Sequence, residues 1–218
     1  MLTKLFETVE SAGIQVDHAC EVGVYLPDVS NVRGWIAAGV RTMLVECDPV
    51  IVRQLQERFG ALPNVRIEDV AVADAAGRLT LFRAGASTFG SNVLQSPAIV
   101  NDGYRMESSS TFEVAAVTFD AIDDGTIDLL SIDIEGGEWF VLRHMRSRPE
   151  IISVETHGKR YVNPHLREIL AWCDAEGYGA WYRDRSDTVF RRGWTAPVED
   201  RSPPMSLFRR IKKAVRGW

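Results

Sequence analysis

Two short segments combine acidic residues with the features expected at strand ends. The sequence "SIDIEGGEW", residues 131–139, ends an apolar run on Asp133 and Glu135 and continues with a glycine pair. Further on, "VETHG" places Glu155 and His157 two positions apart, which in a strand would point both side chains to one face. Two carboxylates and an imidazole can orient a hydroxyl group and remove its proton, and this is the role that we predict for Asp133, Glu155 and His157.

Two other roles stay open for the same residues. His157 could form an ordinary hydrogen bond within a loop. Alternatively, Asp133, Glu155 and His157 could bind a divalent cation, although no dense metal motif accompanies them. We therefore predict no metal and keep this site as an alternative. Glu135 is expected to stabilise the first turn of a following helix, since negative charge favours a helix N-terminus.

We expect a sheet to position these acids. Short apolar runs, typical of buried strands, alternate along the chain with amphipathic segments, typical of helices. This alternation predicts an α/β fold with a mainly parallel sheet. The expected strands are 18–24, 41–49, 64–74, 126–134 and 150–157, and 178–184 and 187–193 would form a closing antiparallel hairpin. Residues 84–110, rich in Gly and Ser, are predicted to be one long irregular segment.

Helices are predicted between these strands from their start and stop residues. The expected segments are 27–39, from Pro27 to Gly39; 49–59, capped by Asp48; the segment after the glycine pair; and a last helix from Asn163 and Pro164 to Gly177. The apolar residues expected to face the core are Val29, Val32, Ile36, Ile51, Leu55, Phe59, Trp139, Leu142, Met145, Leu166, Ile169, Leu170 and Cys173.

In an open parallel sheet, ligands bind beyond the carboxyl ends of the strands. Five acids fall at or beside such ends: Glu21, Glu46, Asp69, Asp133 and Glu155. Glu46 follows Gly23 by 23 positions, close to the spacing at which an acid accepts hydrogen bonds from a ribose. A nucleoside ligand is indicated. The first turn, "EVGVYLPDVS", has one glycine and Pro27, which disfavours a dinucleotide and favours S-adenosylmethionine, since this cofactor has no phosphate.

Composition limits the remaining possibilities. The chain has 218 residues, a net charge of -5 and three widely separated cysteines, which argues for one main domain, against nucleic-acid binding and against a disulfide framework. The N-terminal residues contain acids and no long apolar run, so we expect a cytoplasmic protein.

Several motifs together resemble the FkbM-type S-adenosylmethionine-dependent methyltransferases. "CEVGVY", "LVECDP", "NVRIEDVAVAD", "VTFDAI", "DLLSIDIEGGEWFVLRHM" and "IISVETHG" occur in the order typical of that family, over roughly residues 15–160. The resemblance implies a Rossmann-like, seven-stranded methyltransferase sheet. It also implies an S-adenosylmethionine site over the first three strands and, over the fourth and fifth, an acceptor hydroxyl, often of a sugar or a polyketide-type natural product.

The resemblance assigns roles to individual positions. Glu21 and Gly23 resemble the turn beside the methionine part of the cofactor, and Glu46 resembles the acid that binds the ribose. Asp69 and the backbone of Val70 would face the adenine. Asp133 resembles the family acid nearest the methyl group, so it is expected to contact both cofactor and acceptor.

One segment departs from the family pattern. Tyr25, Leu26 and Pro27 stand where small residues and a second glycine are usual, so the cofactor loop must differ, and Ser30 or Asn31 could supply contacts there. We predict an O-methyltransferase in polysaccharide or natural-product biosynthesis. A non-catalytic binding module is the alternative, and a nucleotide-dependent oxidoreductase is a more distant one.

The C-terminus differs in composition from the rest of the chain. After "RSPP", the segment "MSLFRRIKKAVRGW" contains Arg209, Arg210, Lys212, Lys213 and Arg216 and no acid. Its apolar residues fall on one face of a helix, which is typical of an amphipathic segment at a membrane surface. We therefore predict a methyltransferase domain over 1–194 and a linker and tail over 195–218. The tail could contact the inner face of the cell membrane, or pack on its own domain or on another subunit.

Overall fold

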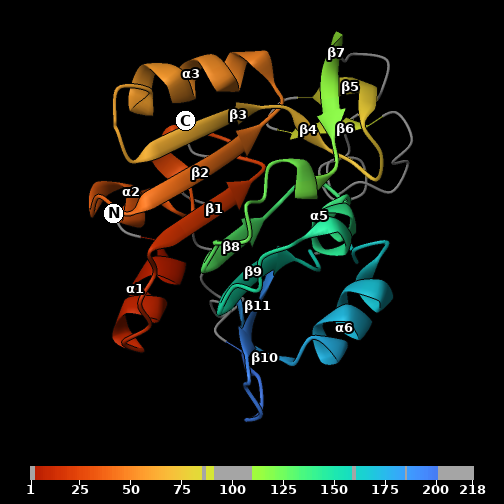
Figure 1. The fold of residues 1–218 in the computed structure, drawn as a ribbon. Coiled ribbons are helices and arrows are strands. Elements are labelled where there is room, and N and C mark those ends of the chain that lie inside the picture. The colour runs from red at the N-terminus through yellow and green to blue at the C-terminus, as the bar shows by residue number, and fades with distance from the viewer. Residues whose placement is uncertain (1–2, 85–86, 91–109, 159–160, 185, 201–218) are drawn as a thin grey trace, which may run out of the picture.

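The computed structural model describes residues 3–84, 87–90, 110–158, 161–184 and 186–200. Its main feature is an eight-stranded sheet (Figure 1). In spatial order, the strands are β12 (Glu199–Asp200), β10 (Tyr178–Asp184), β11 (Asp187–Arg192), β9 (Ile151–Glu155), β8 (Leu129–Ile132), β1 (His18–Val22), β2 (Arg41–Glu46) and β3 (Val65–Asp69). The strand β11 runs antiparallel to both neighbours, and the other pairs are parallel.

The predicted α/β class is therefore confirmed. The seven expected strands form the sheet, the closing hairpin is β10 and β11, and the two-residue strand β12 is added beside β10. The parallel strands β1, β2, β8 and β9 are almost wholly buried, because helices cover both faces.

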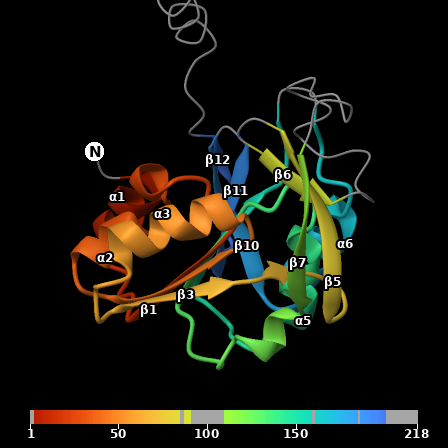
Figure 2. The ribbon, with the colours of Figure 1, turned by 90° about the horizontal axis from the view of Figure 1, so that it is seen from above.

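Helices pack on the two faces of this sheet, as Figure 2 shows. The helices α1 (Lys4–Ser11), α2 (Arg33–Ala37) and α3 (Pro49–Phe59) cover one face, where the sheet residues Ala19, Leu44 and Ile151 belong to one apolar cluster. The helices α5 (Glu138–His144) and α6 (Leu166–Ala175) cover the other, where the sheet contributes Cys20 and Val154. As predicted, Leu142 and Met145 lie in this core, with Trp139 partly buried against it.

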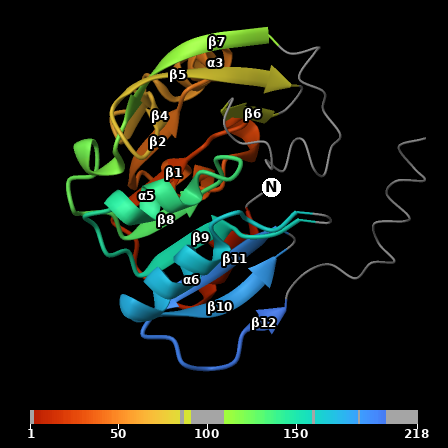
Figure 3. The same ribbon diagram turned by 90° about the vertical axis from the view of Figure 1, so that its right-hand side faces the viewer.

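A second, four-stranded sheet was not predicted. It has the order β4 (Ala71–Val72), β7 (Ser110–Val117), β5 (Gly77–Ala84) and β6 (Ser87–Gly90), and it lies beyond the ends of β1, β2 and β3 (Figures 1 and 3). The expected third strand is thus divided at Val70 between two sheets. The prediction of an irregular segment over 84–110 was wrong for 87–90, which pair with β5; 85–86 and 91–109 lie outside the described residues.

The helix predicted over 27–39 is divided into the short 3-10 helix η1 (Pro27–Val29) and α2. Ser30 has φ -48° and ψ 132°, outside the helical region, because its hydroxyl and the next amide bind Glu21 instead. As a result, Val29 is 56% exposed rather than buried. Leu170 was also wrongly assigned to the core, since it is 43% exposed on α6, whereas Ile169 and Cys173 are buried as expected.

Asp48 caps α3 as predicted, accepting a hydrogen bond from the Val50 amide at 2.8 Å. Another short 3-10 helix, η3 (Phe119–Ala121), precedes β8. In the described part of the chain, no helix has the length and apolar character needed to cross a bilayer.

The predicted basic tail and its five cationic residues lie outside the described residues. The boundary at residue 194 stays a prediction, although Glu199 and Asp200 extend the sheet beside β10.

Candidate functional site

The turn after β1 lies directly against the chain that leaves β8. Gly23 has φ +85°, and a Cβ atom there would come within 1.9 Å of the Asp133 carbonyl oxygen. The Asp133 amide also donates to the Val22 carbonyl at 3.0 Å. Only glycine fits this close approach and this backbone conformation. The predicted cofactor turn and the predicted catalytic acid are therefore parts of one backbone junction.

Glu21 holds the loop that departs from the family pattern. Its carboxylate accepts hydrogen bonds from the Ser30 hydroxyl at 2.5 Å and the Asn31 amide at 2.9 Å, and the Asn31 side chain donates to Ser131 on β8 at 3.1 Å. Burial raises the pKa of Glu21 to about 7, although these hydrogen bonds favour the charged form. Ser30 and Asn31 thus bind Glu21 and fix the segment that follows Tyr25, Leu26 and Pro27.

Glu46, at the end of β2, is oriented by three backbone amides. Its Oε1 accepts from Cys47 at 2.7 Å and Asp48 at 2.8 Å, and its Oε2 accepts from Val24 at 2.9 Å. Burial raises its pKa, while the same amides lower it. A carboxylate can accept about four hydrogen bonds, so one position remains for a hydroxyl donor.

Asp69 is the register partner of Glu46 on β3 and is exposed. Val70, which follows it, is partly buried against the core. Two neighbouring carboxylates therefore stand at the ends of β2 and β3, one buried and oriented and one accessible. This is the arrangement that a ribose and an adenine amine require, since both groups donate hydrogen bonds to carboxylates.

The ends of β8 and β9 bring several carboxylates together. Asp133 is exposed at the surface; desolvation by the neighbouring protein and the negative charges of Asp187 and Glu135 raise the pKa of its carboxyl group above the usual range. Burial and the charge of Asp133 raise the pKa of Glu155 to about 10. Like charges this close resist simultaneous ionisation.

Asp187, the first residue of β11, pairs with Glu155 in the sheet register, and burial raises its pKa to about 6. The sequence interpretation missed this residue, because the register of the closing hairpin against β9 cannot be read from the two strands separately.

Glu138 is the other acid that the sequence interpretation missed. It is fully buried; its Oε1 accepts from the amides of Ile134 at 2.9 Å and Gly136 at 3.1 Å, and its Oε2 accepts from the Asn163 side chain at 2.6 Å. We predicted a turn-stabilising role for Glu135; Glu138 makes these hydrogen bonds to the turn, and Glu135 has a left-handed backbone with φ 58°. The sequence contained a signal for this role, because Glu138 directly follows the glycine pair and stands at the first position of α5.

His157 does not join the acids in the way that strand alternation suggested. The strand β9 ends at Glu155, so the alternation of side chains stops before His157. Its Nδ1 lies 2.9 Å from the Thr156 hydroxyl, which is 2.6 Å from that of Thr188, and burial lowers its pKa. Among the described residues, the group with metal-ligand spacing is Asp133, Glu138 and Glu155, so Glu138 takes the place that the sequence interpretation gave to His157.

Comparison with known proteins assigns the chain to a family. Residues 21–179 match the methyltransferase FkbM domain. The chain belongs to the FkbM methyltransferase family. The family assignment predicted from the sequence motifs is therefore confirmed, and the protein is a methyltransferase.

A solved structure with a similar fold is a predicted O-methyltransferase, protein Atu636 from Agrobacterium tumefaciens. It is 14% identical, with a TM-score of 0.41, over 85% of this chain and 78% of that chain. No curated protein matches the sequence.

Methyltransferases of the FkbM family generally use S-adenosylmethionine, and the residues at β1 to β3 fit this cofactor. Glu46 retains one acceptor position, and Asp69 is exposed beside it. Glu21 is already engaged with Ser30 and Asn31, so it would act by shaping the loop rather than by binding the cofactor through both its oxygens.

Proposed function

We propose that this FkbM methyltransferase transfers a methyl group from S-adenosylmethionine to a hydroxyl of a sugar, glycan or related natural product. The observation that carries the proposal is the convergence of Asp133 and Glu155 at the ends of β8 and β9, with Asp133 in backbone contact with Gly23. The cofactor residues and the acceptor residues therefore meet at one point of the sheet.

S-adenosylmethionine, when bound, supplies an electrophilic methyl group on a positively charged sulfur. The residues of this chain would then have two tasks. Glu46 and Asp69 would hold the nucleoside, and the carboxylates of Asp133 and Glu155 would orient the acceptor hydroxyl and accept its proton as the new oxygen–carbon bond forms. His157 would act only through Thr156, with which its ring forms a hydrogen bond.

The charge around Asp133 favours a neutral acceptor that donates hydrogen bonds. Glu135, Glu138 and Asp187 all raise the pKa of the Asp133 carboxyl in addition to its burial, so an anionic acceptor would be repelled. A sugar presents several hydroxyl donors and no charge. This supports a saccharide acceptor over a carboxylate or a phosphate.

The first test is calorimetric titration of the protein with S-adenosylmethionine and, separately, with NADH, repeated on Glu46→Ala. We expect micromolar binding of S-adenosylmethionine, weakened at least tenfold, about 1.4 kcal/mol, by the substitution. Binding of NADH in its place would favour an oxidoreductase. Binding of neither would favour a non-catalytic member of the family.

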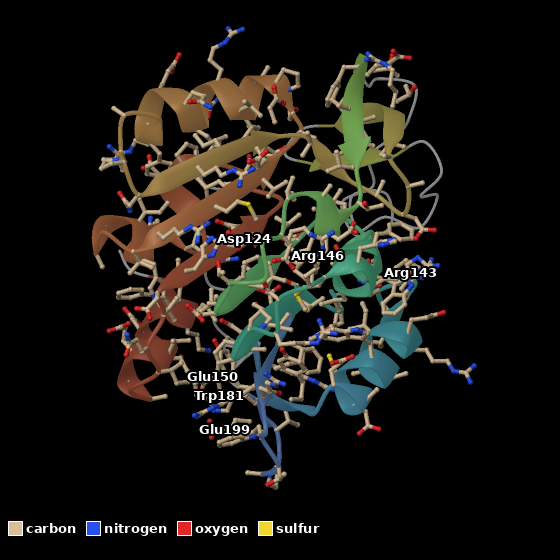
Figure 4. All side chains as sticks on the ribbon, viewed as in Figure 1. Asp124, Arg143, Arg146, Glu150, Trp181 and Glu199 are labelled. Carbon is tan, nitrogen blue, oxygen red and sulfur yellow. The ribbon has the colours of Figure 1, made fainter. Side chains whose placement is uncertain are left out.

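The second test is turnover on a panel of neutral glycans, measured as release of S-adenosylhomocysteine. Asp133→Asn is expected to lower the rate at saturating S-adenosylmethionine at least about a hundredfold, the usual effect of losing a general base. Asp124→Asn is the matched control, since Asp124 lies at the opposite end of the sheet (Figure 4), paired with Arg41.

We further propose that the tail contacts the inner surface of the cell membrane and brings the cytoplasmic enzyme to a lipid-linked acceptor. Support comes from the five basic residues at 209–216 and the absence of acids in this segment. Co-sedimentation with anionic vesicles should be lost on truncation before Met205. Equal sedimentation of both proteins would contradict this role.

A further inference from the structure

Three carboxylates from three elements converge at the acceptor end of the site. One oxygen each from Asp133, Glu138 and Glu155 lies within 4.8 Å of the other two. Ligands on opposite sides of one ion are about 4.2 Å apart for Mg²⁺ and about 4.8 Å apart for Ca²⁺, twice the metal–oxygen distance. The three oxygens are therefore close enough to share a single cation.

Glu138 is held rigidly but not saturated. Two backbone amides bind its Oε1, and the Asn163 side chain binds its Oε2. One acceptor position on Oε2 remains. Asn163 also donates to the Glu155 carbonyl at 3.0 Å, so a single amide side chain fixes the relative positions of two of the three acids.

Within the described residues, two buried polar atoms in this region have no hydrogen-bond partner. They are the Oε2 of Glu155 and the hydroxyl of Tyr161, whose residues are 9% and 3% exposed. Burial raises the pKa of Tyr161, and the negative charges of Glu138 and Glu155 raise it further. A buried polar atom without a partner is destabilising, and a bound ligand would supply the missing interaction.

Basic side chains in the described part of the chain do not compensate this charge. Arg143 of α5 and Arg146, which follows this helix, form ion pairs with Asp74 and Asp120 (Figure 4). The charged groups that most affect the Glu155 carboxyl are all acidic. Glu138 and Glu155 are buried and Asp133 beside them is exposed. A divalent cation would offset the negative charge of two buried carboxylates and a third at the surface.

We propose that Asp133, Glu138 and Glu155 bind one divalent cation, with the Tyr161 hydroxyl facing its remaining coordination positions. A ligand set made only of oxygen favours Mg²⁺, Mn²⁺ or Ca²⁺ over Zn²⁺. The binding site does not depend on the proposed methyl transfer. Its role does: if the acceptor is an alcohol, the cation would hold the hydroxyl beside Asp133 and favour loss of its proton.

The test is calorimetric titration of full-length protein, first treated with EDTA, with Mg²⁺, Mn²⁺ and Ca²⁺ separately, in the absence of S-adenosylmethionine. We expect one site, with affinity reduced at least tenfold by Glu155→Gln or by Asp133→Asn. Glu150→Gln is the matched control, because Glu150 precedes the same strand at its other end (Figure 4), paired with Arg191 on the surface. It should bind within twofold of the wild type.

A thermal scan of the wild type keeps the test decisive if a variant folds poorly. The most tightly bound cation should raise its Tm, and Tyr161→Phe should reduce this increase. No binding and no change in Tm with all three cations would overturn the proposal. The proposal would also be overturned if the protein bound a cation only after Lys159→Met or Arg160→Met. That result would mean that Lys159 or Arg160, which lie outside the described residues, neutralises the acids in the wild type. Neither measurement uses the cofactor or the acceptor. Failure of the cation site can therefore be distinguished from failure of the proposed methyl transfer.

Discussion

The acids at the ends of β1 and β2 differ from those at the ends of β8 and β9 in their hydrogen bonding. Glu21 and Glu46 accept hydrogen bonds from a hydroxyl and from backbone amides. Glu155 retains a buried oxygen without a partner, and Tyr161 beside it does too. Both regions contain buried carboxylates. In the described part of the chain, Glu21 and Glu46 have donors for both oxygens, whereas one oxygen of Glu155 has none. This difference is what the proposed cation would remove.

The two regions meet at Gly23, so a side chain at this position should have the largest effect. Gly23→Ala is expected to lower the free energy of unfolding by about 3 kcal/mol or more. The left-handed backbone alone accounts for about 1–2 kcal/mol, and the contact with Asp133 adds to it. Urea denaturation provides the measurement. Gly39 has φ +79° and no atom near its Cβ position, so Gly39→Ala should lower the free energy of unfolding only by the cost of the left-handed backbone. Equal losses would show that the backbone contact carries little energy.

The same substitution in the two regions should have effects of opposite sign. Glu46→Gln is expected to destabilise the protein by about 1–3 kcal/mol, since an amide NH₂ would replace an acceptor that faces backbone N–H groups. Glu155→Gln should stabilise the cation-free protein at neutral pH by about 1.4 kcal/mol or more, the equivalent of one pKa unit. A glutamine does not have to take up a proton on folding, whereas Glu155, with its pKa raised to about 10, does. Denaturation in EDTA measures both. A loss of stability in both variants would remove the distinction between the two regions.

The smallest predicted effect is a change in pH dependence. Burial raises the pKa of Glu21 from 4.5 to about 7, so the folded protein binds this proton more tightly than the unfolded chain. Its contribution to stability is fully present below pH 4.5 and is lost as the pH rises through 7, with a slope of at most about 1.4 kcal/mol per unit. Glu21→Gln should flatten the pH profile of stability in this range, whereas the exposed Glu113→Gln should not. An unchanged profile would show that Glu21 is already ionised when folded.

Local sequence patterns predicted much of this fold. Apolar runs with acids at their ends identified β2 and β9, and Asp48 before Pro49 identified the start of α3. These signals depend on residues that are neighbours in the chain. The division of the expected third strand between two sheets depends instead on pairing with β7, some 40 residues away, and no local pattern contains it.

The site could be predicted only where its residues lie within one motif. Asp133, Glu155, Glu46 and Gly23 were identified because each follows an apolar strand. The hydrogen bond from the Ser30 hydroxyl to Glu21 was not predicted, because it joins a loop to a strand. Asp187 and the bond between Asn163 and Glu138 arise from tertiary structure that joins distant segments, so their part in the site becomes visible only in three dimensions.

The parallel pairing of β12 with β10 determines how the enzyme would face a surface. Glu199 and Asp200 pair with Tyr182 and Arg183, so the chain leaves the sheet at the end where β9 stops at Glu155. Residues 201–218 continue from there. If the tail binds a membrane as proposed, its point of attachment to the sheet lies on the side of the molecule that carries Asp133 and Glu155.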